Sequence, residues 1–136
     1  MAKIAAGLGL ELVPYPGKAD IYVINTCTVT GNADKKSRHA IRYAKKINPD
    51  SKVIVTGCYV ETDNLNLKEI DLVIRNKNKF DLAKYLSNER CVTRNALLIT
   101  HYASPRIRAN LMIEDGCENF CSYCIVPYVR GKIRSR

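Results

Sequence analysis

The chain has 136 residues, of which 46% are hydrophobic and 26% are charged, values typical of globular proteins rather than disordered or fibrous ones. This length suffices for one ordinary domain and a piece of a second, but not for two complete enzyme domains. Twenty-two Lys and Arg against thirteen Asp and Glu give a net charge of +9. Such an excess favours a polyanionic partner such as nucleic acid, although solubility alone also explains it.

Membrane and export signals are weak or missing. No apolar run reaches the roughly 18 residues of a membrane-spanning helix, so we expect a soluble protein without a membrane partner. The first ten residues weakly resemble a secretory signal, but Glu11 interrupts the apolar stretch and no small-residue cleavage pattern follows. Six cysteines without an export signal fit reduced ligands or core residues better than disulfides. The sequence therefore predicts a cytoplasmic location.

Helix and strand patterns alternate along the first two thirds of the chain. A helix over 1–9 precedes a buried strand at 20–25, where four consecutive apolar residues have turn-forming neighbours. The next helix begins at Thr28 or Thr30 and ends at Asn48-Pro49, with its apolar residues at helical spacing. Further along we expect a strand at 52–56, a short helix at 65–70, a strand at 71–74 and a helix at 79–88.

This alternation predicts an open, parallel α/β sheet with right-handed crossovers, of the flavodoxin-like kind. Its first strand is missing, because none precedes the helix at 1–9. Between 89 and 105 we find no helical periodicity and expect a linker. Ile107, Ala109, Leu111 and Ile113 then alternate with polar residues, which predicts a half-buried strand that runs into Asp115-Gly116. The expected domains are 1–88 (flavodoxin-like), 89–105 (linker) and 106–136 (the start of a second domain).

A cysteine-rich loop follows this last strand. Cys117, Cys121 and Cys124 are spaced C-x3-C-x2-C, so three thiolates can hold three irons of a cubane cluster and leave the fourth iron open to a substrate. Structural zinc normally has four ligands, and the nearest candidates to complete it are the isolated Cys91 and His101. The four-cysteine run of ferredoxins is absent. Zinc binding, electron transfer and a purely structural role remain weaker alternatives.

With Tyr123 before its last cysteine, the loop resembles that of the radical S-adenosylmethionine superfamily. The resemblance implies that Cys117, Cys121 and Cys124 ligate a 4Fe-4S cluster, that the backbone near Tyr123 lies against the adenine of S-adenosyl-L-methionine, and that an electron donor reduces the cluster. It further implies that 106–136 is the first strand and cluster loop of a (β/α) barrel. Only 12 residues follow Cys124, so most of such a barrel would lie outside this sequence.

Two other cysteines, Cys27 and Cys58, each follow a predicted parallel strand. Ligands of open α/β sheets bind at the edge where such strands end, and the helix after Cys27 would direct its N-terminus at both thiols. The pair is thus a candidate metal site, although lone cysteines near strands are more often core residues. Cys91 fits neither set, and we interpret it as a packing residue.

Three stretches resemble the methylthiotransferases: 25–38, Thr56-Gly57-Cys58, and 115–136 with its Arg130-Gly131. Members of this family combine a flavodoxin-like N-terminal domain, a radical barrel and a small RNA-binding domain. The resemblance implies that Cys27 and Cys58 ligate a second 4Fe-4S cluster, which takes part in sulfur insertion. The third cysteine ligand of that auxiliary cluster is absent from this chain.

Within the family, 28–38 and Asn48-Pro49 resemble the tRNA enzymes that act on N6-threonylcarbamoyladenosine next to the anticodon. We therefore expect a part of an enzyme that inserts a methylthio group at C2 of that nucleoside, with tRNA as partner and no activity in this part alone. The alternatives are a ribosomal-protein aspartate methylthiotransferase, another radical enzyme, or a non-catalytic metal-binding module.

The second predicted helix carries a row of basic residues, spaced three or four apart so that they share one face. An RNA-backbone contact and an ordinary solvated face both explain this row, which consists of Lys35, Arg38, Arg42 and Lys45.

Overall fold

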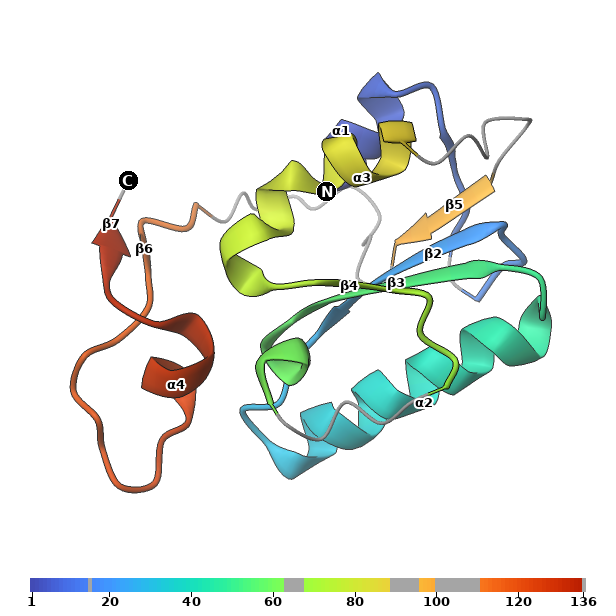
Figure 1. Ribbon diagram of the computed structural model, residues 1–136. Helices are drawn as coiled ribbons and strands as arrows, with labels where there is room; N and C mark the ends of the chain where they lie inside the picture. Colours follow the sequence, from blue (N-terminus) through green and yellow to red (C-terminus); the bar gives the residue numbers. More distant parts are fainter. Residues whose placement is uncertain (15, 63–67, 89–95, 100–110, 136) are drawn as a thin grey trace.

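The computed structural model describes residues 1–14, 16–62, 68–88, 96–99 and 111–135 (Figure 1). A parallel sheet forms the middle layer, with helix α2 (Gly31–Ile47) on one face and helices α1 (Ala2–Gly7) and α3 (Leu82–Asn88) on the other. The α/β class and the parallel sheet agree with the sequence prediction and are compatible with a flavodoxin-like domain.

In the described residues, five strands make up this sheet in the order β1-β5-β2-β3-β4, and all neighbours are parallel. A smaller unit beyond it contains helix α4 and an antiparallel pair, β6 with β7. The remaining bounds are β1 (Glu11–Leu12), β2 (Ile21–Thr26), β3 (Lys52–Gly57), β4 (Leu72–Ile74), β5 (Ala96–Ile99), β6 (Glu114–Asp115), α4 (Val126–Arg130), β7 (Arg134–Ser135) and the 3-10 helices η1 (Cys58–Glu61) and η2 (Asn76–Asp81).

The core lies on both faces of the sheet, because consecutive strand residues point to opposite sides. Tyr22 and Ile24 of β2 pack with Ile41 of α2 in one cluster. Ile21 and Val23 instead pack with residues of α1 and α3 on the other face. An unbroken apolar run is what a strand covered on both sides requires. None of the helices in the described residues is both long and apolar enough to cross a membrane.

Helix α2 has the ends that its sequence predicts. Its N-cap is Thr30, whose Oγ1 accepts a hydrogen bond from the backbone N of Ala33 at 3.2 Å. Asn48 follows the helix in an extended conformation, which the next residue, Pro49, favours. The Asn48 side chain donates to the carbonyl of Ala19 at 2.9 Å and so anchors this end beside β2.

Four features differ from the sequence prediction. The segment expected to be a linker contains β5, which pairs with both β1 and β2. The strand expected to end at Asp115 is wrong for 111–113, which are exposed and outside any strand, whereas 107–110 lie outside the described residues. Residues 68 and 69 form a turn and Ile70 belongs to no helix, whereas a helix was expected to end here; 65–67 are not described. The last helix begins later than expected, because η2 occupies the preceding residues.

Candidate metal centre

Cys27 and Cys58 lie at the edge of the sheet where β2 and β3 end. The register pairs Thr26 with Gly57, so the two cysteines are the residues that directly follow a paired position. Cys58 is buried and Cys27 is exposed. The sheet therefore delivers both thiols to one edge, the edge at which open parallel sheets bind ligands.

Gly57 makes this close approach possible. Its φ is +104°, and a Cβ built on it would lie 2.2 Å from the carbonyl oxygen of Thr26. A side chain at this position would thus need both a left-handed backbone and a wider gap between the strand ends. The hydroxyl of Thr26 also donates to the carbonyl of Thr56 at 2.6 Å, which draws the two strands together.

Ser37 of α2 holds the loop that carries Cys27. The backbone N of Cys27 donates to Ser37 Oγ at 3.2 Å, and that hydroxyl lies 3.2 Å from the carbonyl oxygen of Cys27 and 2.9 Å from that of Ala33. Ser37 is buried. The cysteine is therefore fixed against the first turns of α2 through its own backbone, which leaves its thiol free of this contact.

The second cysteine group begins with a similar turn. Gly116 has a φ of +97°, and a Cβ there would lie 2.2 Å from the carbonyl oxygen of Lys132. The backbone N of Cys117 donates to the carbonyl of Gly131 at 3.1 Å. Together with the pairing of β6 and β7, this bond closes residues 117–131 into one loop.

Within this loop Cys121 is exposed, Cys117 and Cys124 are half-buried, and all three are free thiols. The backbone N of Cys124 donates to the carbonyl of Cys121 at 2.9 Å, which forms a turn between them. Three soft thiols within eight residues suit an iron–sulfur cluster chemically. In the described part of the chain, however, no three His, Cys, Asp or Glu residues lie close enough together to hold a metal ion. Tyr123 is 90% exposed.

Arg130 of α4 connects the two cysteine groups. A hydrogen bond with Cys58 raises the pKa of Arg130, burial lowers it, and electrostatic interactions with Cys58, Asp115 and Cys27 raise it. An Arg130 nitrogen also lies 3.5 Å from Asp115 Oδ1, just before the cysteine loop. One cation is thus shared between the thiols at the sheet edge and the start of the C-terminal unit.

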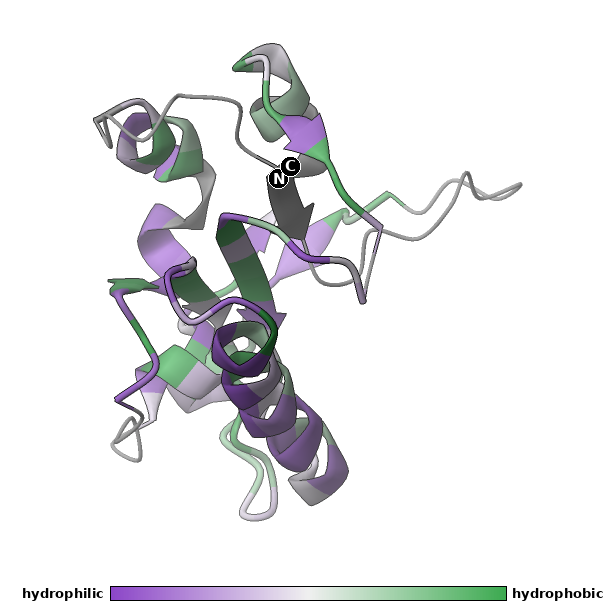
Figure 2. Cartoon of the chain, turned by 90° about the vertical axis from the view of Figure 1, so that its right-hand side faces the viewer, coloured by the Kyte–Doolittle hydropathy of each residue, from purple (hydrophilic) through white to green (hydrophobic). Residues whose placement is uncertain are grey.

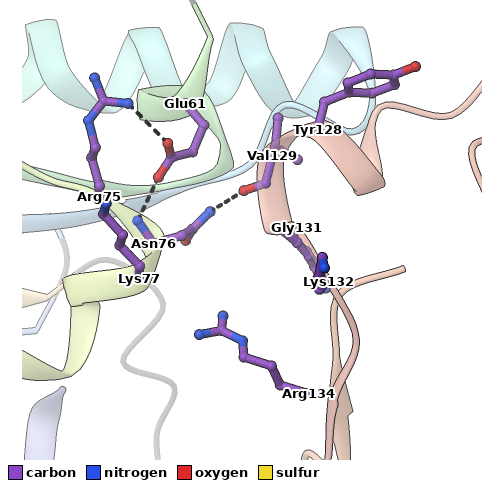
Figure 3. Close-up of a pocket in the computed structure, with 10 residues that line it drawn as sticks. Glu61, Arg75, Asn76, Lys77, Tyr128, Val129, Gly131, Lys132 and Arg134 are labelled. Carbon is purple, nitrogen blue, oxygen red and sulfur yellow. Dashed lines mark hydrogen bonds and ion pairs between the residues drawn. The ribbon is translucent and has the colours of Figure 1, made fainter. Parts of the chain in front are cut away.

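A second connection runs through Asn76. Its side chain donates to the carbonyl of Val129 at 2.8 Å, and its backbone N donates to Glu61 Oε1 at 2.7 Å (Figure 3). Glu61 in turn accepts from Arg75 at 3.2 Å. Polar contacts therefore bind the C-terminal unit to the sheet edge near both ends of η1, at Cys58 and at Glu61.

The four basic residues of α2 do not share one role. Helix α2 is largely hydrophilic in colour (Figure 2). Lys35 and Arg42 are exposed, whereas Arg38 pairs with Asp34 at 2.9 Å. Lys45 pairs with Asp71 at 2.8 Å.

That last pair ties α2 to the sheet. Burial raises the pKa of Asp71, but hydrogen bonds from Lys45 and from the backbone N of Val53 outweigh it and hold the pKa below the usual carboxyl value. Lys45 also donates to the carbonyl of Ser51 at 2.6 Å. Lys45 is therefore engaged in holding the fold together.

Spacing and residue type predicted the cysteines but gave no positioning role to Ser37, Gly57, Asn76, Arg130 and Gly131. All of these except Asn76 lie in stretches that resemble the methylthiotransferases. Glycine directly before a cysteine, at both 57 and 116, was an available signal. Cys91 and His101 lie outside the described residues.

Comparison with known proteins identifies the family of this chain. The family described as "Uncharacterized protein family UPF0004" matches residues 1–76. The chain belongs to the UPF0004 family. It is 39% identical to the threonylcarbamoyladenosine tRNA methylthiotransferase MtaB of Aquifex aeolicus, over 93% of this chain and 35% of that protein. The MtaB protein of Bacillus subtilis is 37% identical, over 94% of this chain and 32% of its own length.

Other members of the family are also similar. The ribosomal protein uS12 methylthiotransferase RimO of Dictyoglomus thermophilum is 34% identical, over 95% of this chain and 33% of that protein. The chain thus spans about a third of the length of these curated relatives. The resemblance to methylthiotransferases is confirmed.

Proposed function

We propose that this chain is part of a cytoplasmic tRNA methylthiotransferase that inserts a methylthio group at C2 of N6-threonylcarbamoyladenosine next to the anticodon. The observation that carries the proposal is that Arg130 interacts both with Cys58, at the sheet edge, and with Asp115, just before the loop from Cys117 to Cys124. The similarity to MtaB proteins supports the choice of nucleoside.

The cysteines divide into two ligand sets in this proposal. Cys117, Cys121 and Cys124 would hold a 4Fe-4S cluster, which when bound and reduced by an electron donor supplies the electron that cleaves S-adenosyl-L-methionine. Cys27 and Cys58 would hold the auxiliary cluster together with a cysteine from outside this chain. The chain itself contributes the positioning: Gly57 and Ser37 fix the backbone of the two cysteines at the sheet edge, and Arg130 places a positive charge beside them.

The proposed activity predicts a specific product. The full-length protein, purified without oxygen and supplied with iron, sulfide, reductant and S-adenosyl-L-methionine, is expected to convert N6-threonylcarbamoyladenosine in tRNA to its 2-methylthio form. Mass spectrometry of the digested tRNA measures this product, and residues 1–136 alone serve as the inactive control. A methylthio group found on ribosomal protein uS12, with none on tRNA, would favour the activity named for RimO.

The exposed basic side of α2 supplies a further prediction. Replacing Lys35 and Arg42 by Glu in the full-length protein should weaken tRNA binding, because both lie on the solvent face and reversed charges repel phosphates. The slope of log affinity against log salt should fall by about 1 to 2. Fluorescence anisotropy at several KCl concentrations measures both quantities.

The matched control reverses Lys18 and Lys84, two exposed residues elsewhere in the chain, and so changes net charge equally. If the Lys35 and Arg42 variant has the same affinity and salt slope as this control, the basic side of α2 is an ordinary solvated face. Arg38 and Lys45 are left unchanged because each is already paired within the fold.

A further inference from the structure

A cleft of about 390 Å³ lies between the sheet edge and the C-terminal unit (Figure 3). One wall is the segment after β4, with Arg75, Asn76 and Lys77. The other wall is the end of α4 and the chain that follows it, up to Arg134. The cleft is separate from the α2 face, since none of its lining residues belongs to that helix.

Positive charge dominates this cleft. Among the described residues that line it are five basic side chains and one carboxylate, that of Glu61, which is paired with Arg75 at 3.2 Å. Arg130 is paired with Asp115. Within the part of the chain that the structure describes, the other three cations have no acidic partner at ion-pair distance. These three are Lys77, Lys132 and Arg134, and all are exposed.

The two walls are held in place without a ligand. Asn76 joins them through its 2.8 Å hydrogen bond to the carbonyl of Val129. Lys132 and Arg134 lie on the segment that Cys117 and β6 fix through Gly131 and β7. Because the backbone of both walls is already fixed, an anion that binds here has to order only the cationic side chains, which favours affinity.

An aromatic side chain lies at the rim of the cleft. Tyr128 lines it and is 71% exposed. Its ring meets Phe120 edge-to-face, with centroids 5.8 Å apart. Exposed aromatic rings beside a cationic groove are characteristic of surfaces that bind single-stranded nucleic acid, where bases stack and phosphates contact Lys and Arg. A site for a free phosphate ion would not need such a ring.

We propose that this cleft binds a phosphate of single-stranded RNA through Lys77, Lys132 and Arg134, with an adjacent base stacked on Tyr128. The proposal rests on the proposed function in so far as the RNA is the tRNA loop to be modified. Because Arg130 lines the same cleft and contacts Cys58, an RNA bound here lies next to both cysteine groups.

The test reverses two of these three exposed cations in the full-length protein. Lys77→Glu with Lys132→Glu should lower affinity for a tRNA anticodon stem-loop about tenfold or more, and should reduce the salt slope by about 1 to 2. Lys18→Glu with Lys84→Glu, which changes the net charge equally, should leave both nearly unchanged. Circular dichroism checks folding, and Lys77→Gln with Lys132→Gln, which only removes charge, should give a smaller loss. Equal affinity of the cleft and control variants would overturn the proposal.

Tyr128 separates RNA binding from binding of an isolated anion. Tyr128→Ala should weaken stem-loop binding by roughly 5- to 100-fold, whereas Tyr128→Phe keeps the ring and should retain affinity. If inorganic phosphate competes with the stem-loop at low millimolar concentration and Tyr128→Ala binds RNA normally, the cleft is an anion site and not an RNA site.

The two proposals can fail independently. Wild-type protein that binds the stem-loop through the cleft but makes no methylthio product would overturn only the proposed function. Product formation with cleft variants that bind RNA as tightly as the control would overturn only the proposed RNA site.

Discussion

Alanine in place of any one of Cys117, Cys121 and Cys124 in the full-length protein is expected to abolish deoxyadenosine formation. Each substitution removes one of three thiols that share an eight-residue loop, and a three-cysteine cluster cannot lose a ligand without exposing or releasing an iron. Methylthiolation of tRNA must then be lost as well. Mass spectrometry of deoxyadenosine and of the modified nucleoside, beside the iron content of each variant, measures the effect.

Alanine in place of Cys27 or Cys58 should separate these two activities. Both variants should still cleave S-adenosyl-L-methionine, because the loop from Cys117 to Cys124 is intact, yet they should make no methylthiolated tRNA. Cys58 is 6% exposed, so Cys58→Ser and circular dichroism are needed to distinguish a lost ligand from a packing defect. A normally folded Cys27→Ala enzyme that modifies tRNA at full rate would show that this cysteine is not a ligand.

Local patterns were sufficient to predict the central part of the fold. The apolar run from Ile21 to Ile24 predicts a strand covered on both faces without any knowledge of the strands that pair with it. A capping Thr30 and a terminal Asn48-Pro49 likewise define α2 by contacts within a few residues. Such signals are local, and the structure reproduces them.

Pairing between distant segments could not be predicted in this way. Strand β5 consists of only four residues and lies between β1 and β2 in the sheet. Its partner residues in those two strands come more than 70 residues earlier in the chain. Four apolar residues alone do not distinguish a strand from an apolar stretch in a linker. The alternation from Ile107 to Ile113 gave a wrong prediction for residues 111–113 for a related reason. Alternating apolar residues form a strand only where a neighbouring strand pairs with them, and Leu111 is instead 81% exposed.

The candidate site likewise contains residues that local patterns predict and residues that only contacts between distant segments position. The cysteines could be named from spacing and residue type, but their supports depend on contacts between elements. In the sequence, Ser37 is only a polar residue within a predicted helix, whereas in the structure it contacts the backbone of Cys27. Arg130 acquires its position from the packing of α4 on η1, more than 65 residues away from its own place in the sequence.

Gly57→Ala is expected to remove methylthiolation while it leaves the cysteines themselves in place. Its φ of +104° costs a side chain about 1 to 3 kcal/mol, and the new Cβ would lie 2.2 Å from the Thr26 carbonyl oxygen. That neighbour is backbone and cannot rotate away. The strand ends must therefore separate, which moves Cys27 and Cys58 apart and lowers stability.

Gly31→Ala is the matched control. Gly31 begins α2, a Cβ there would meet nothing within 4 Å, and alanine favours helices more than glycine does, so stability should stay equal or rise by up to about 1 kcal/mol. Thermal unfolding and amide hydrogen exchange at Thr26 and Cys58 report the strand ends, and mass spectrometry reports the product. Because the loop from Cys117 to Cys124 is closed by its own contacts with Gly131, deoxyadenosine formation should survive in Gly57→Ala. If this variant instead makes methylthiolated tRNA at the rate of Gly31→Ala, the close approach of β2 and β3 is not what holds the two thiols in their working position.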